Sequence, residues 1–259
     1  MTEPFSKRFG VLPKPPQLLR TEAPLKMRSA LVRMLSENNV DICVAAEALC
    51  KAERKIPPSY LTTSYLRKRG DWDGVEIQLS KSQAEWYEVF DFIEILCTQL
   101  GSHELEQKIN ELFVEFHIGW KVLDGRIETR GDELFESTVQ SARGNLESAG
   151  RLTAKAELEE ALASLSHRPI PDSRGAISRS IGALEALAKD ITKEPNATLG
   201  QIIKRLDLPQ PLEVAATKLW GYASDQARHV TEGVTPNRAE AAFVIQVCAA
   251  FISYLSKSD

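Results

Sequence analysis

The chain has 259 residues, of which 43% are hydrophobic and 26% are charged, and its formal net charge is −4 at pH 7. A chain of this length can bury a substantial core and is expected to form two modest domains. The acidic balance, with a pI of about 5.7, provides no overall field that attracts nucleic acid. RNA binding would therefore need a local basic patch.

The N-terminus and the cysteines predict a cytoplasmic protein. The opening residues MTEPFSKRFG lack the apolar run of a secretory signal. The four cysteines have no C-x-x-C spacing and lie within helical patterns, so they are expected to be reduced and mostly buried. The longest apolar run, 239–255, is interrupted by Glu240, Gln246 and Ser253. We expect it to be too short to span a bilayer and predict no membrane partner.

The first hundred residues show helical patterns separated by breakers. Five prolines in the first two dozen residues predict an extended arm. Apolar spacing then predicts helices from Leu25 to the Asn38-Asn39 stop and over 41–55. The stretch 59–74 contains Gly and Asp residues that argue against a continuous helix. Helices are predicted again over 83–100 and 102–116, and Ser102 can cap the second of these with half of a capping box.

The strongest local pattern is a β-hairpin in GWKVLDGRIETR, residues 119–130. The Asp-Gly pair at 124–125 suits a two-residue type I′ turn, which fixes the register of the flanking strands. This register places apolar side chains on one face and an opposite-charge pair on the other. The predicted cross-strand pairs are Val122 with Ile127, Trp120 with Thr129, and Lys121 with Glu128.

The remainder of the chain has helical periodicity. Two helices are predicted over 132–148 and 153–166, and a third begins after a cap at Asp172. Short helices are predicted around 199–206 and 212–222, and the last helix is predicted to begin at Thr235-Pro236. Apolar positions after Asp172 repeat at steps of four and three, which is typical of a bundle helix. The last helix is apolar nearly all round and is predicted to be the buried centre.

These elements predict a mainly α fold with two helical domains joined by a short β-hairpin. The predicted N-terminal helical domain, with its extended proline-rich arm, covers 1–118. The hairpin connector covers 119–130, and a C-terminal up-and-down helical bundle covers 131–259.

Arg228 and His229 stand side by side in the polar segment LWGYASDQARHVTEG, between two apolar helical runs. A permanently charged guanidinium beside an imidazole can cleave a phosphodiester without a metal. His229 would act as general acid or base toward the ribose 2′-hydroxyl or the leaving 5′-oxygen, and Arg228 would stabilise charge on the phosphate. Neighbouring helical side chains point about 100° apart, so their convergence needs a helix end or a partner subunit. In the structural alternative, Arg228 pairs with Glu232 or Glu185 and His229 closes a loop.

Three further residues could support this site. Glu185 stands beside the apolar seam of its predicted helix and could orient His229, or it could simply reach water at the margin of the seam. Arg174 and Arg179 of the same helix could extend a phosphate-binding surface. Exposed arginines on a helix are more often only solvated, which is the alternative for this pair.

A second candidate RNA-binding segment lies in the N-terminal half. Arg67, Lys68 and Arg69 follow Tyr65 and precede Trp72, which combines cations with rings on which bases stack. Alternatively, the aromatic residues are satellite core residues under a loop and the basic triplet is solvated. The sequence has no glycine-rich phosphate loop, no H-E-x-x-H and no clustered His or Cys set. We therefore expect neither a metal nor a cofactor.

Four segments carry a resemblance to a known family. FSKRFG at 5–10 resembles the opening of the AbiJ-type N-terminal domain, and the hairpin at 119–130 resembles the one that joins its two halves. PDSRGAISRSIGALEALAKDI at 171–191 resembles the first core helix of a HEPN-like domain, and 224–233 resembles its Arg-His motif. The chain thus resembles bacterial abortive-infection proteins that pair an AbiJ-type N-terminal domain with a HEPN-like C-terminal helical domain.

The resemblance implies an antiphage defence protein with an all-α bundle that often dimerises. In active members the bundle is a metal-independent endoribonuclease that acts as a toxin or stress effector. The usual HEPN signature places four to six residues between Arg and His, whereas this chain has only the adjacent Arg228-His229, similar to a variant in some relatives. A catalytically inactive RNA- or protein-binding module is therefore the alternative, and a dimer whose N-terminal half acts as a sensor is a third. RNA, a second copy of the chain, and a protein partner or antitoxin are the expected partners.

Overall fold

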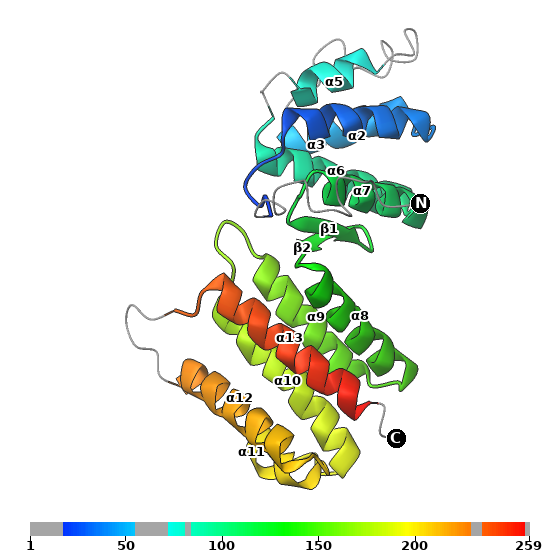
Figure 1. The fold of residues 1–259 in the computed structure, drawn as a ribbon. Helices are drawn as coiled ribbons and strands as arrows, with labels where there is room; N and C mark the ends of the chain where they lie inside the picture. The colour runs from blue at the N-terminus through cyan, green and yellow to red at the C-terminus, as the bar shows by residue number, and fades with distance from the viewer. Residues whose placement is uncertain (1–17, 55–71, 81–83, 229–234, 257–259) are drawn as a thin grey trace, which may run out of the picture. The chain divides into compact units, whose positions relative to one another are not determined.

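The computed structural model describes residues 18–54, 72–80, 84–228 and 235–256. It is mainly helical with one two-stranded hairpin, which confirms the predicted fold class (Figure 1). The chain divides into two compact units, unit 1 over Met1–Arg130 and unit 2 over Gly131–Asp259, and each unit has its own hydrophobic core.

Unit 1 is built from helices and the hairpin. Its elements are α2 (Leu25–Glu37), α3 (Ile42–Glu53), α5 (Asp73–Ser80), α6 (Trp86–Leu100), α7 (His103–Glu115), β1 (Trp120–Leu123) and β2 (Arg126–Thr129). Ser102 caps α7 by accepting the N–H of Leu105 at 3.3 Å, as the sequence predicted. The sequence predicted an irregular stretch over 59–74, but its last two residues belong to helix α5, which begins at Asp73. Val75 and Leu79, one turn apart on α5, are both fully buried and anchor this helix on the core.

The hairpin has the predicted register. Each cross-strand pair forms as expected, and Asp124 and Gly125 both have positive φ, as a type I′ turn requires. The Lys121 ammonium lies 3.2 Å from the Glu128 carboxylate on the more open face. The opposite face carries Trp120, Val122, Ile127 and Thr129, all buried.

Side chains of α6 and α7 hold the hairpin within unit 1. Glu94 of α6 accepts the N–H of Ile127 at 2.7 Å, and Glu106 of α7 accepts the N–H of Gly125 at 2.6 Å. The Thr98 hydroxyl donates to the Gly125 carbonyl at 3.1 Å. The hairpin is therefore part of the unit 1 core as well as the last element before unit 2.

Unit 2 is an all-helical bundle. Its elements are α8 (Glu133–Ser148), α9 (Leu152–Ser166), α10 (Ser173–Thr192), α11 (Leu199–Ile202), a 3₁₀ turn (Ile203–Arg205), α12 (Gln210–Arg228) and α13 (Arg238–Leu255). Asp172 caps α10 by accepting the N–H of Gly175 at 2.8 Å, as predicted.

Helix α10 is the centre of the bundle, where the sequence predicted α13. Helix α10 packs against four helices, α9, α11, α12 and α13, whereas α13 packs against three, α8, α9 and α10 (Figure 1). The outer face of α13 is left uncovered, with Phe243 64% and Tyr254 45% exposed. The prediction was wrong because an apolar composition all round a helix does not say how many neighbours the bundle provides.

Two helix boundaries also differ from prediction. Helix α13 begins at Arg238 rather than at Pro236, because Asn237 and Glu240 form a complete capping box. Helix α12 continues from Gln210 through Arg228, well past the predicted end near residue 222. Its polar C-terminal half keeps a buried stripe, since Leu219 and Ala223 follow Ala216 at helical spacing.

By length and composition alone, α13 could cross a membrane, since its 18 residues have a mean hydropathy of 1.4. The sequence-based expectation that this run is too short is not supported by that measure. In the structure, 44% of the helix is buried within unit 2, where Val244, Ile245 and Cys248 face the core.

Candidate nucleic-acid interface

Arg228 is the last described residue of α12, within a helix rather than in the loop that the sequence predicted. Its side chain and the whole of His229 lie outside the described residues. Helix α12 is held by packing against α10 and α11. The ring of Trp220 lies so close to Gly200 that a Cβ at that glycine would approach it within 2.8 Å. Helix α12 is therefore held against α11 at Trp220, eight residues before Arg228.

Glu185 is engaged in contacts on its own side of the bundle. One carboxylate oxygen lies 2.7 Å from the Lys189 ammonium, and the other accepts the N–H of Leu199 at 2.9 Å. The second bond satisfies a free N–H in the first turn of α11, so Glu185 joins α10 to α11.

Glu185 and the end of α12 lie at different levels of the bundle. Leu199, which Glu185 contacts, adjoins Gly200, and Gly200 packs on Trp220. Arg228 follows Trp220 by eight residues, a rise of about 12 Å along the helix. The described contacts of Glu185 therefore connect it to α11 and not to the last turn of α12.

The two arginines of α10 do not form one surface. Arg174 lies half-buried in the first turn, and Arg179 follows five residues later, about 140° around the helix. The Arg179 guanidinium donates to both carboxylate oxygens of Glu157, at 2.9 and 3.1 Å, and this bond raises the pKa of Arg179. A phosphate would have to compete with that carboxylate.

Arg179 belongs to a row of ion pairs along a groove of about 900 Å³ between α9 and α10, which the sequence analysis did not predict. The Arg151–Asp190 pair at 3.0 Å and the Lys189–Glu185 pair at 2.7 Å extend the row. Because each cation in the row has its own carboxylate, the groove has no net positive charge with which to attract RNA.

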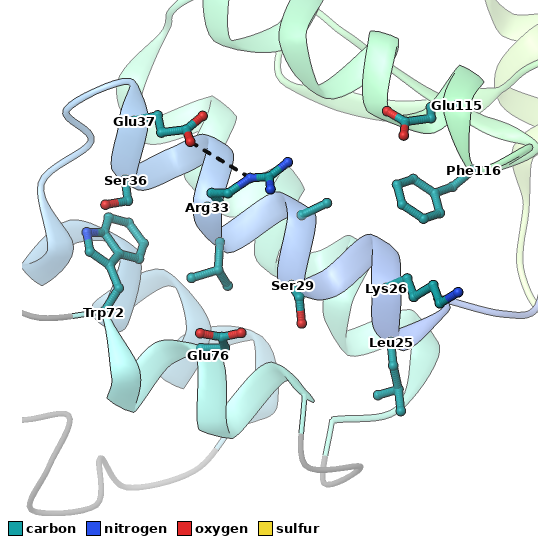
Figure 2. Close-up of a pocket in the computed structure, with 12 residues that line it drawn as sticks. Leu25, Lys26, Ser29, Arg33, Ser36, Glu37, Trp72, Glu76, Glu115 and Phe116 are labelled. Atoms are coloured by element: carbon teal, nitrogen blue, oxygen red, sulfur yellow. Dashed lines mark ion pairs between the residues drawn. The ribbon is translucent and has the colours of Figure 1, made fainter.

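In unit 1, the basic triplet Arg67, Lys68 and Arg69 lies outside the described residues. Trp72 is half-buried, packs against the unit 1 core and lines a groove of about 890 Å³ along α2. Figure 2 shows Trp72 and Glu76 on one side of α2, and Glu115 and Phe116 on the other.

The charge of this unit 1 groove is unfavourable to RNA. Three carboxylates line it, from Glu37, Glu76 and Glu115, against the cations of Lys26 and Arg33. Arg33 also lies 3.8 Å from Glu37, as the dashed line in Figure 2 marks. Trp72 therefore fits the alternative of a satellite core residue better than a base-stacking platform.

A second groove in unit 2 escaped the sequence analysis. It lies between α12 and α13, has a volume of about 490 Å³, and we call it the α12–α13 groove. Tyr222 and Phe243 border it and are 36% and 64% exposed, and Leu219 and Val244 form a buried floor. The all-round apolar pattern of α13 was the signal that could have revealed it.

Two charged residues stand at this groove, Lys218 on α12 and Glu240 on α13. Partial burial and the nearby Glu240 carboxylate raise the pKa of the Tyr222 phenol, so its hydroxyl keeps its proton at neutral pH. In the part of the chain that the structure describes, no three His, Cys, Asp or Glu side chains gather as metal ligands.

A family model for the AbiJ N-terminal domain 4 matches residues 3–145. The match covers more than half of the chain, including every described helix of unit 1, the hairpin and most of α8. The chain belongs to the AbiJ N-terminal domain 4 family. This AbiJ protein is therefore associated with abortive infection. Comparisons with curated proteins and with solved structures gave no match.

Proposed function

We propose that this AbiJ protein is an abortive-infection effector whose C-terminal unit is a HEPN-like, metal-independent endoribonuclease. The observation that carries the proposal is the continuation of α12 through Arg228. The residues that precede the Arg-His pair lie in a helix that packs against α10 and α11. Membership of the AbiJ family and the all-helical bundle of unit 2 support the same function.

The proposed reaction is an attack of the ribose 2′-hydroxyl on the adjacent phosphorus. The 2′-oxygen forms a bond to phosphorus while the bond from phosphorus to the 5′-oxygen breaks, which leaves a 2′,3′-cyclic phosphate and a 5′-hydroxyl. His229 accepts the proton of the 2′-hydroxyl while water protonates the leaving 5′-oxygen, or His229 protonates the 5′-oxygen while water accepts the 2′-hydroxyl proton. Arg228 stabilises the negative charge that develops on the phosphate.

A second copy of the chain is part of this proposal. In the proposed reaction, Arg228 of one copy and His229 of the other act on the same phosphate. Unit 2 has an uncovered apolar surface suited to self-association. We call it the outer groove, and Leu134, Leu212, Phe251 and Tyr254 line its volume of about 490 Å³.

The test is RNA cleavage by the purified full chain in EDTA. We expect cleavage by the wild type and its loss in His229→Ala and Arg228→Ala, together with loss of growth arrest on expression. His103→Ala is the matched control, because the His103 side chain on α7 is 80% exposed in unit 1. Absence of RNA cleavage, with wild type and His229→Ala equally harmless to cells, would refute the nuclease.

The adjacent Arg and His, without the usual spacing, favour one alternative function. In this alternative, unit 2 is a catalytically inactive module that binds RNA or a partner protein such as an antitoxin. Tight binding that persists in His229→Ala, without any turnover by the wild type, would establish it.

A further inference from the structure

The groove along α2 in unit 1, which we call the α2 groove, has a shape that suits a helical segment of another protein. Its floor is the outer face of α2, which has 13 residues and therefore rises about 20 Å. Trp72 and Glu76 stand on one side of this floor, and Glu115 and Phe116 stand on the other (Figure 2). An amphipathic helix can lie along such a floor, between two walls.

The α2 groove offers apolar contacts to such a helix. Leu25, the first residue of α2, is 55% exposed, and Ala30 lies partly buried in the floor. Trp72 and Phe116 are also partly buried, so each wall carries one aromatic ring. A partner can therefore bury apolar side chains here.

Carboxylates outnumber cations in the α2 groove. The three carboxylates, of Glu37, Glu76 and Glu115, are all exposed. Lys26 and Arg33 are the cations among the residues that line the groove, and Arg33 lies 3.8 Å from Glu37. The excess negative charge therefore comes from Glu76 and Glu115, on opposite walls. Charge complementarity favours a cationic partner.

Two helices end at the α2 groove with a carboxylate in the last turn. Glu37 is the last residue of α2 and Glu115 is the last residue of α7, and neither helix has a basic residue in its last turn. The C-terminal end of a helix carries a partial negative charge, so a cation is favoured there and a carboxylate is not. A cation supplied by a partner would stabilise both helix ends.

Arginine suits the walls of the α2 groove better than lysine. Its planar guanidinium stacks on the face of an aromatic ring and donates two parallel hydrogen bonds to a carboxylate. Trp72 and Glu76 are one helical turn apart, since Glu76 donates its backbone N–H to the Trp72 carbonyl at 2.9 Å. Phe116 directly follows Glu115. Each wall thus combines one ring with one carboxylate, the two groups that a guanidinium binds.

We propose that the α2 groove binds an arginine-bearing, amphipathic helical segment of a partner protein. The apolar side of that segment contacts Leu25 and Ala30, and its arginines contact Glu76 and Glu115. RNA is disfavoured, because its phosphates would meet the same carboxylates. The site lies in unit 1 and does not depend on the proposed ribonuclease of unit 2.

The test is fluorescence anisotropy with dye-labelled peptides and the full chain. The probe is an amphipathic peptide of about 12 residues, with leucines on one side and arginines on the other. Its counterparts carry lysine or glutamate in place of every arginine. Glu76→Gln and Glu115→Gln each remove one carboxylate from a wall. Glu111→Gln is the matched control, because Glu111 is exposed on α7, one turn before Glu115, and does not line the groove.

We expect each glutamine variant to bind the arginine peptide about 2- to 5-fold more weakly, which is the effect of one exposed charge pair. The double glutamine variant should bind it about 4- to 25-fold more weakly, and Glu111→Gln should match the wild type. The lysine peptide should bind the wild type more weakly than the arginine peptide. Glu76→Arg combined with Glu115→Arg should reverse the preference in favour of the glutamate peptide, a gain that a folding defect cannot produce.

Equal binding of the arginine peptide by the wild type and the double glutamine variant overturns the groove site. Equal affinity for the lysine peptide overturns the choice of arginine. Two results would assign the groove to another occupant. A change in the mass of the protein in the double arginine variant, measured by light scattering, would assign it to a second copy. Tighter binding of a synthetic peptide of residues 1–17, lost in the double glutamine variant, would assign it to the chain's own first residues.

Discussion

Asn110 of α7 forms two hydrogen bonds with the backbone of Val122 in β1. Its Nδ2 donates to the Val122 carbonyl at 2.8 Å, and its Oδ1 accepts the Val122 N–H at 2.7 Å. The side-chain amide thus takes the place of a third strand beside the hairpin. Val122 is buried, so both backbone groups depend on this one side chain.

Asn110→Ala should lower the free energy of unfolding by about 2–3 kcal/mol, because a buried donor and a buried acceptor lose their partner together. Asn110→Asp should not rescue this loss, because its carboxylate accepts the N–H but sets a second acceptor oxygen against the Val122 carbonyl. Urea unfolding followed by circular dichroism measures both. Asn196→Ala, at an exposed position in unit 2, is the control and should change stability by less than about 0.5 kcal/mol. If Asn110→Ala unfolds with the same free energy as this control, the Asn110 side chain does not stabilise the hairpin.

Gly200→Ala should destabilise the protein by about 1 kcal/mol or more, because the new Cβ would lie 2.8 Å from the Trp220 ring. Gly144→Ala should have the opposite effect on stability. A Cβ at this position meets nothing within 4 Å, and Gly144 lies inside α8. Replacing a glycine inside an open helix raises stability by about 0.5–1 kcal/mol. The unfolding temperature should fall in Gly200→Ala and rise in Gly144→Ala. A shift of the same sign in both variants would be inconsistent with this packing.

In the proposed dimer, Leu134→Asp should separate the two copies, because it places a charge in the outer groove, where Leu134 is 67% exposed. Light scattering measures the mass against the 28.8 kDa of one chain. Leu152→Asp is a matched control, since Leu152 is 69% exposed on α9 and does not line that groove. A wild type that is monomeric at every concentration would remove the second copy from the proposed mechanism.

A thiol reagent at pH 8 should modify Cys43 much faster than the other three cysteines. Burial raises the pKa of Cys97 and of Cys248 to about 12, with carboxylates near Cys97 adding to its shift, and burial also raises the pKa of Cys50. The thiolate is the reactive form, so these three groups should stay unmodified until the chain unfolds. Cys43 is half-buried. Mass spectrometry after timed labelling, with a guanidinium-unfolded control that reacts four times, measures this order, and early labelling of Cys248 would contradict it.

Glu185→Gln should retain most of the stability and of the proposed ribonuclease activity, because the amide oxygen can still accept the N–H of Leu199. Glu185→Ala should lose about 1 kcal/mol of stability through that bond, whereas the partly exposed pair with Lys189 adds little. RNA cleavage and thermal unfolding are measured on both variants. If Glu185 instead orients His229, both variants should lose cleavage equally while the unfolding temperature of Glu185→Gln is unchanged.

Local patterns predicted local structure well. The Asp-Gly turn determined the hairpin register, and Ser102 and Asp172 cap the helices that the sequence assigned to them. Capping and turn chemistry depend on residues a few positions apart, so one sequence carries that information.

Features that depend on distant contacts could not be predicted. Arg28 is buried and donates to the carbonyls of Ala23, Leu79 and Ala84, at 2.7, 2.9 and 2.7 Å, which joins α2 to the ends of two other elements. No spacing in the sequence indicates these partners. The uncovered face of α13 is a similar case, because it depends on where the bundle places α10. The Arg-His pair was selected from its residue types alone. Its role in RNA cleavage is tested by the His229→Ala and Arg228→Ala variants.

Two side chains protect the outer edges of the hairpin, because they pair with backbone groups of Val122 and Ile127 that point away from the other strand. A sheet edge with unpaired amides is a template on which other chains add strands and grow into fibres. Glu94 and Asn110 already occupy these positions on the two strands. The hairpin should therefore not seed amyloid, even where the protein accumulates to high concentration.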